Sequence, residues 1–199
     1  VFYILENNIR GLDIDQRAYQ LSYFALMMKG RGYNRRFFTG REVEQEGRSW
    51  RKYPSPDVRA IKESNTLPDD LVNQIKENFI GVFNDNELKC IQYVMDLFKD
   101  AKEYGSILNV DNEARQYASV ALKLYSLIDE THPYCIENNL DIVQRLLIAE
   151  HFPIIDELMM QACVMSENYD VVITNPPYMG GSGMSKKLYE YAKKYYYNS

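Results

Sequence analysis

The stretch Tyr169-Asp170-Val171-Val172-Ile173-Thr174-Asn175-Pro176-Pro177-Tyr178 joins a short apolar run to a stiff turn. The apolar run, Val171 to Thr174, predicts a buried strand that ends abruptly. Asn175 and Pro176 each precede a proline, which excludes the α region and stiffens three successive backbone units. We therefore expect a rigid turn that aims its carbonyl groups at a fixed place beyond the strand.

Such a turn suits the alkylation of a planar exocyclic amine, whose delocalised lone pair is a poor nucleophile. If the Asn175 side-chain oxygen and the Pro176 main-chain oxygen each accept an amino proton, the nitrogen becomes pyramidal and its lone pair faces an electrophilic methyl group. Tyr178 can stack on a flat substrate such as an extruded adenine, a contact worth about 1–3 kcal/mol. A plain Asn-Pro turn that closes a strand is the alternative, but the preceding strand and the following tyrosine favour catalysis.

The beginning of the chain predicts half of a βαβ unit. Ile9 to Asp13 is short and apolar and ends in an acid, as in a parallel strand whose carboxyl end meets a ligand. Asp15 is placed to cap a helix that follows directly, and Gly30 and Gly32 are expected to end that helix.

The middle of the chain changes character at Pro68. Residues 35–67 are polar and twice broken by proline, which predicts irregular structure with a short strand at residues 36–39. From Pro68 helical spacing dominates, with a predicted short strand at residues 105–110 between helices. A last helix is expected from Ser185 to Tyr195.

Both ends of the chain resemble one family. Asn175-Pro176-Pro177-Tyr178 matches the catalytic motif of S-adenosylmethionine-dependent amino-methyltransferases, the adenine-N6 DNA enzymes above all. The segments Asn8–Asp15, Tyr23–Lys29 and Arg35–Phe38, with Asn175–Met184, are similar to the PglX family of BREX, or phage growth limitation, adenine-specific methyltransferases. Residues 42–169 carry no motif of their own.

The resemblance implies an α/β fold, a partial Rossmann-like class I methyltransferase sheet with a large, mainly helical insertion. Residues 1–40 would supply the second strand and following helix of the core, residues 41–150 the insertion, and residues 151–199 the core with the catalytic turn. The implied catalytic residues are Asn175, Pro176, Pro177 and Tyr178.

The implied cofactor is S-adenosyl-L-methionine. Asp13 stands where the family has an acid for the two ribose hydroxyls, and a carboxylate at a strand end offers two oxygens to a vicinal diol. Ile14 is a candidate for the face of the cofactor base, with a core isoleucine as the alternative. Ser106 stands where related enzymes often have an acid, and a plain core strand is the other interpretation there.

Charge distribution gives the candidate contacts to nucleic acid. The net charge is -5 and the pI about 5.2, yet residues 29–52 hold eight basic side chains (Lys29, Arg31, Arg35, Arg36, Arg41, Arg48, Arg51, Lys52) against three acidic ones (Glu42, Glu44, Glu46). We take Arg35 and Arg36, with Lys186 and Lys187 after the turn, as candidate DNA contacts. A solvated basic loop and a solvated helix face are equally open alternatives.

Several classes of protein are disfavoured by the sequence. There is no apolar run of about 18 residues and no secretory leader, so we expect neither a membrane span nor export, and a cytoplasmic location is the default. Cys90, Cys135 and Cys163 show no CxxC pair, and with two histidines in the chain we expect no metal site.

The expected activity is transfer of a methyl group to N6 of adenine in double-stranded DNA, in bacterial phage defence together with other BREX proteins. The chain starts without the Gly-rich turn that such enzymes need before Ile9, so we expect a fragment that is inactive when isolated. Methylation of a protein glutamine amide and a non-catalytic module that binds DNA or a partner are the alternative functions.

Overall fold

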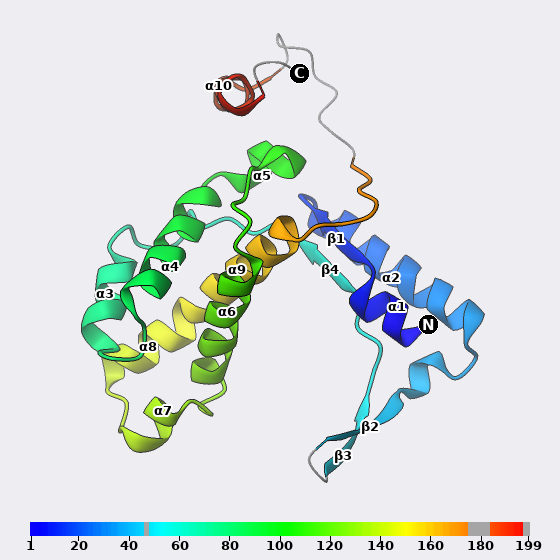
Figure 1. Ribbon diagram of the computed structural model, residues 1–199, viewed down its shortest axis with the longest axis horizontal. Helices are drawn as coiled ribbons and strands as arrows, with labels where there is room; N and C mark the ends of the chain where they lie inside the picture. The colour runs from blue at the N-terminus through cyan, green and yellow to red at the C-terminus, as the bar shows by residue number, and fades with distance from the viewer. Residues whose placement is uncertain (46–47, 175–183, 197–199) are drawn as a thin grey trace. The chain divides into compact units, whose positions relative to one another are not determined.

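The structure, a computed structural model, describes residues 1–45, 48–174 and 184–196. Their contacts divide the chain into two compact units, unit 1 from Val1 to Ile61 and unit 2 from Lys62 to Ser199. Unit 1 mixes helices and strands, whereas the regular elements described in unit 2 are all helical (Figure 1). The chain as a whole is therefore of mixed α/β composition, which agrees with the expected class.

Unit 1 is built on a pair of parallel strands. β1 (Arg10–Asp13) pairs with β4 (Asp57–Ala60) in a register that sets Gly11 beside Val58 and Asp13 beside Ala60. α1 (Phe2–Asn7) precedes β1 and α2 (Gln16–Tyr33) follows it. A Cβ on Gly11 would lie 3.1 Å from Val58 Cγ1, so the missing side chain lets the two strands approach closely.

Helix α2 begins as predicted but ends later. The Asp15 carboxylate accepts hydrogen bonds from the backbone N–H groups of Arg17 and Ala18, which is an N-cap. The helix then passes through Gly30 and ends at Tyr33. Gly30 is used for close packing, since a Cβ there would lie 2.6 Å from Cζ of the buried Phe37 ring.

Residues 35–60 contain more regular structure than the sequence predicts. A 3₁₀ turn, η1 (Phe37–Thr39), stands where a short strand was expected, and β2 (Arg41–Gln45) pairs antiparallel with β3 (Arg48–Lys52). These strands and β4 lie in unit 1, so the region predicted as the start of a helical insertion belongs to the strand-containing unit. The hairpin is rich in charged residues, which is why its strands resemble a loop in sequence.

Unit 2 is a helical bundle (Figure 1). Its elements are α3 (Leu71–Asn78), α4 (Asp85–Leu97), α5 (Ala101–Tyr104), η2 (Gly105–Ile107), α6 (Ala114–Ile128), α7 (Pro133–Glu137), α8 (Ile142–Glu150), α9 (Phe152–Ser166) and α10 (Lys186–Tyr195). α6 and α9 lie side by side at its centre, and α4 and α8 pack against α9.

The core of unit 2 follows from helical spacing. Buried residues of α6 recur three and four positions apart, and α9 is apolar on most of its surface (Tyr117, Val120, Ala121, Leu124 and Leu127; Phe152, Ile155, Leu158, Met159 and Ala162). The ring of Phe152, at the start of α9, lies 5.1 Å from that of Phe79 and 6.2 Å from that of Phe83 between centroids, and both partners come from the connection between α3 and α4. This burial makes α9 part of the helical bundle.

Two further predicted strands, besides the one expected at residues 36–39, are not formed. Residues 105–110 contain the 3₁₀ turn η2, and residues 171–174 have no regular structure. The side chains of Val171, Val172 and Ile173 are 75%, 72% and 93% exposed, so the expected burial is also wrong. A strand needs a neighbour to satisfy its backbone groups, and no strand of the described residues pairs with this segment.

Candidate functional site

Asp13 ends β1 and stands at the carboxyl end of a parallel strand pair. Its backbone oxygen accepts a hydrogen bond from Ile61 N at 2.7 Å, just beyond β4. Its side-chain Oδ1 accepts a bond from Asp15 N at 2.8 Å. Within the described part of the chain no group donates to Oδ2, so this partly exposed carboxylate retains an oxygen for a ligand.

Asp13 and Asp15, the two acids of this loop, accept hydrogen bonds from different backbone groups and therefore have different roles. Asp15 is the helix cap, and the N–H groups of Arg17 and Ala18 hold the pKa of its carboxyl below the usual value. Ile14, between the two acids, has 49% of its surface exposed. Ile14 is therefore not a core residue in the described part of unit 1, and its side chain presents an exposed apolar surface next to Asp13 in the chain.

Ser106 does not join Asp13 at a strand end. It lies in η2 of unit 2 and is exposed. The strand that borders Asp13 is β4, which the sequence reasoning missed, and the residue across from Asp13 is Ala60. The missed signal was the pattern Asp57-Val58-Arg59-Ala60, in which Asp57 pairs with both Arg10 and Arg59. These charges are neutralised within the sheet and do not mark a loop.

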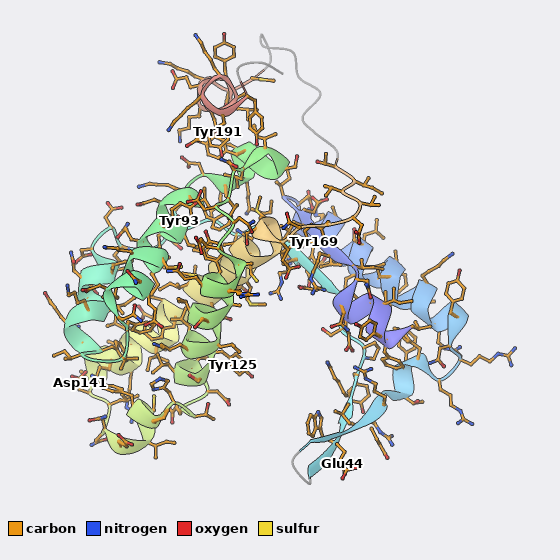
Figure 2. All side chains as sticks on the ribbon, in the orientation of Figure 1. Glu44, Tyr93, Tyr125, Asp141, Tyr169 and Tyr191 are labelled. Atoms are coloured by element: carbon orange, nitrogen blue, oxygen red, sulfur yellow. The ribbon has the colours of Figure 1, made fainter. Side chains whose placement is uncertain are left out.

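The predicted catalytic residues Asn175, Pro176, Pro177 and Tyr178 lie outside the described residues. Their upstream flank is tied to the bundle through Tyr169, labelled in Figure 2, whose hydroxyl donates to Val164 O at 2.7 Å. This hydrogen bond holds Tyr169 against the last turn of α9.

The downstream flank is α10, whose start agrees with the prediction. Ser185 caps it by accepting a bond from Leu188 N at 3.1 Å. Lys187, predicted to contact DNA, forms an ion pair with Asp100 at 2.6 Å, and this partner raises the pKa of Lys187 and lowers that of Asp100. Lys186 is exposed and lies 3.9 Å from Glu190.

The basic segment of unit 1 is partly neutralised by its own acids. Arg41 and Lys52, which face each other at the base of the hairpin, both contact Glu6 of α1, at 2.8 and 3.0 Å. Glu6 keeps 8% of its side-chain surface exposed. Arg35 and Arg36, before η1, are exposed and stay candidates for phosphate contact.

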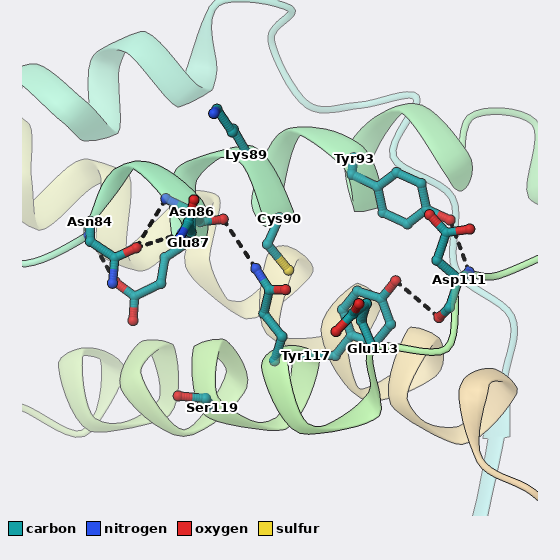
Figure 3. A pocket seen from close by; sticks show the side chains of 11 residues that line it. Asn84, Asn86, Glu87, Lys89, Cys90, Tyr93, Asp111, Glu113, Tyr117 and Ser119 are labelled. Atoms are coloured by element: carbon teal, nitrogen blue, oxygen red, sulfur yellow. Dashed lines mark hydrogen bonds between the residues drawn. The ribbon is translucent and has the colours of Figure 1, made fainter.

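A groove of about 530 Å³ opens between α4 and α6 (Figure 3). At one end, Asp111 N donates to the Tyr93 hydroxyl and the Tyr117 hydroxyl donates to Asp111 O. Burial raises the pKa of both phenols, and burial with the nearby charges of Glu113 and Glu87 raises that of the Cys90 thiol to about 11. This groove was not predicted from the sequence, and its protonated thiol and phenols offer no base or nucleophile at neutral pH.

The described residues form neither a metal site nor a membrane span. No group of three or more His, Cys, Asp or Glu side chains among the described residues could hold a metal ion. Over the same part of the chain, every helix is too short or too polar to cross a bilayer.

The family model described as Eco57I restriction-modification methylase matches residues 7–199. The chain belongs to this methylase family. The match covers both the Asp13 loop and the segment 175–178, so the two ends that carried the resemblance lie in one family domain. The matched range also spans unit 2.

Two curated relatives match nearly the whole chain. The methylase chain is 34% identical over 201 residues to the adenine-specific methyltransferase BrxX of Escherichia coli O9:H4 (strain HS), which covers 98% of this chain. It is 28% identical over 203 residues to the adenine-specific methyltransferase PglX of Lacticaseibacillus casei (strain Zhang), covering 97% of this chain. The chain spans 16% and 14% of the lengths of these relatives.

Proposed function

We propose that this methylase-family chain carries the acceptor turn and one cofactor contact of an enzyme that methylates N6 of adenine in double-stranded DNA. The methyl donor is S-adenosyl-L-methionine. Both relatives described above are named adenine-specific methyltransferases, and their names, BrxX and PglX, support a role in phage defence with other BREX proteins. A Rossmann-like arrangement of the core is part of the same proposal.

The observation that carries the proposal is the place of Asp13 at the carboxyl end of β1. In open parallel sheets ligands bind beyond the carboxyl ends of the strands. The free Oδ2 of Asp13 can accept a bond from one hydroxyl of a ribose diol, and Oδ1 has a second lone pair for the other. The exposed Ile14 offers an apolar contact for the adjoining base.

The acceptor turn orients the amino group and the ring of the target adenine. When bound, S-adenosyl-L-methionine provides an electrophilic methyl group. The Asn175 side-chain oxygen and the Pro176 carbonyl accept the two amino protons of adenine and direct its lone pair, while Tyr178 stacks on the ring. Transfer leaves a cationic amine that loses a proton readily, so positioning accounts for most of the rate and no general base is required.

Exposed cations assist DNA binding in this proposal. Arg35 and Arg36 of unit 1 are available to contact phosphates, as is Lys186 of α10. Lys187, whose ammonium group pairs with Asp100, would exchange this partner for a phosphate on binding DNA. A glutamine amide as the acceptor has less support, because both relatives are named for adenine.

The test is to sequence modified bases in DNA from cells with the native protein, with none, and with the variants Asn175→Ala and Asp13→Ala. Asn175→Ala should abolish adenine methylation while cofactor affinity stays within a few-fold. Asp13→Ala should weaken cofactor binding by about 10-fold or more, because it removes a charge-assisted bond. Full methylation by the Asn175 variant would refute the proposed role of the turn.

A further inference from the structure

The hairpin of β2 and β3 extends from the rest of unit 1 and has two unlike faces (Figure 1). Residues directly across an antiparallel pair share a face, and successive residues of a strand alternate between faces. The register therefore sorts the side chains into Arg41, Lys52, Val43 and Trp50 on one face and Glu42, Arg51, Glu44 and Ser49 on the other. We call the first the basic face, because its described side chains include two cations and no acid.

The opposite face of the hairpin is acidic. Arg51 Nη2 lies 3.4 Å from Glu42 Oε1, so the base of this face is already paired with an acid. Glu44, labelled in Figure 2, adds a second carboxylate. The sequence of the hairpin mixes acids and bases, but the two-residue period of the strands separates them in space. A polyanion can therefore approach the basic face more favourably than the opposite one.

Glu6 of α1 binds both cations of the basic face through one oxygen. Its Oε2 lies 2.8 Å from Arg41 Nη2 and 3.0 Å from Lys52 Nζ. Its Oε1 is buried and has no hydrogen-bond partner among the described residues. Because one carboxylate faces two cations, this cluster keeps an excess positive charge in the folded unit.

Arg41 and Lys52 differ in how firmly they are held. The Arg41 guanidinium also lies over the ring of Phe2, 5.4 Å from its centroid, and this cation–π contact fixes it further. Lys52 has 45% of its side-chain surface exposed, and within the described part of the chain its ammonium group contacts Glu6 alone. An ammonium group has three N–H donors, so two are left for another anion. Lys52 is therefore the cation of this cluster that can bind a ligand.

Trp50 adds a flat surface next to Lys52. The two residues are two positions apart in β3 and so lie on the same face. Trp50 stands opposite Val43, and such a pair of an aromatic and a β-branched residue stabilises a hairpin. The indole nevertheless stays 45% exposed. Its exposed surface can pack on the sugar of a nucleotide whose phosphate binds Lys52.

We propose that the basic face of the hairpin binds the sugar–phosphate backbone of the substrate duplex, with Lys52 on a phosphate and Trp50 on the adjoining sugar. This inference rests on the proposed function, which supplies double-stranded DNA as the partner. Charge complementarity favours this partner, since duplex DNA carries one negative charge per about 1.7 Å of its axis. The contact is independent of base sequence and helps to position the enzyme on DNA.

The first test measures how the native protein that carries this chain binds a fluorescein-labelled duplex at several salt concentrations. Lys52→Gln removes one phosphate contact, so it should weaken binding about five- to tenfold at about 0.1 M salt and reduce the slope of log K against log salt by about 0.9. This variant keeps the ion pair of Arg41 with Glu6. Arg51→Gln, the matched control, removes the same charge from the adjacent residue on the opposite face and should leave the slope unchanged.

Photo-crosslinking supplies a second measurement that does not depend on affinity. Benzoylphenylalanine in place of Trp50 keeps an aromatic side chain and should crosslink to the duplex under near-ultraviolet light. The same residue in place of Ser49, which is exposed on the opposite face, should crosslink at the background level.

The outcomes separate this inference from the proposed function. If Lys52→Gln and Arg51→Gln change the salt slope equally, or if neither changes it, the basic face does not contact the DNA backbone and the inference is refuted. Crosslinks from position 49 without crosslinks from position 50 also refute it. A wild-type protein that shows the expected binding differences but methylates no adenine supports the hairpin contact and refutes the proposed function.

Discussion

Replacing Gly30 with alanine tests the close packing of α2 on η1. The added Cβ would lie 2.6 Å from Phe37 Cζ and 3.0 Å from both Cε atoms. Phe37 is completely buried and lies 5.1 Å from Phe2 and 5.6 Å from Phe38 between ring centroids, so its ring has little room to move. Gly32, two positions further along the same helix, has no atom within 4 Å of such a Cβ and is the matched control.

The two substitutions allow the packing cost to be isolated. Alanine gains up to about 1 kcal/mol of helix propensity at either position. At Gly30 the overpacked ring costs about 1–3 kcal/mol in addition. The gain in helix propensity nearly cancels when the two variants are compared. The free energy of unfolding of Gly30→Ala should therefore be about 2 kcal/mol lower than that of Gly32→Ala.

Urea unfolding followed by tryptophan fluorescence is the appropriate assay. The chain has a single tryptophan, Trp50, which lies in β3 of unit 1 and therefore reports on the unit that holds α2. If the two alanine variants have free energies of unfolding within 0.5 kcal/mol of each other, a margin set by typical surface substitutions, the packing argument for Gly30 is wrong.

Three further predictions concern hydrogen bonds and ionisation. Gln161→Met should lower the free energy of unfolding of unit 2 by about 2 kcal/mol, measured by far-UV circular dichroism in urea, because the buried amide loses bonds of 2.6 and 3.1 Å to Lys62 N and O; an equal loss in Gln92→Met would contradict this. The lowered pKa of Asp15 means that its cap stabilises unit 1 above the unfolded-state pKa near 3.8 and is lost as pH falls through the folded value; Asp15→Asn should reduce that pH dependence. Cys90, with a pKa of about 11 against 9.0, should be alkylated about 100-fold more slowly at pH 8 than in urea, as judged by mass spectrometry, and equal labelling would show that the thiol is not buried.

Local signals were sufficient where a residue acts on its own neighbours in sequence. The Asp15 cap, the strand that ends at Asp13 and the start of α10 near Ser185 were all predicted from short patterns. Pro153 lies in the first turn of α9, where a proline loses no helical hydrogen bond. Each of these features depends on bonds within a few residues, which is the range that a sequence pattern can express.

Distant partners explain the errors. Strand β4 was missed because Asp57 and Arg59 look like loop residues, yet Asp57 is neutralised by Arg10 from β1. The segment 105–110 was given a strand, although its backbone groups bond to tyrosines of α10 that lie some 80 residues away. The ion pair of Lys187 with Asp100 could not be predicted either, because Asp100 is equally distant in sequence.

For the candidate site, Asp13 and Ile14 were predicted from sequence, and their local geometry agrees with the proposed roles. The assignment of Ser106 depended on a strand that does not form. The residue types required by the chemistry were therefore easier to predict than the three-dimensional neighbours that hold them in place.

The double hydrogen bond between Gln161 and Lys62 joins the last helix of the central bundle to the first residue of unit 2. The segment between Lys62 and Gln161, about a hundred residues long, thus begins and ends at the same place in the structure. A segment whose ends meet can lengthen, shorten or be exchanged during evolution without pulling apart the strands from which it emerges. The Gln161 side chain therefore holds the start of unit 2 against α9, a helix that begins about ninety residues later in the chain.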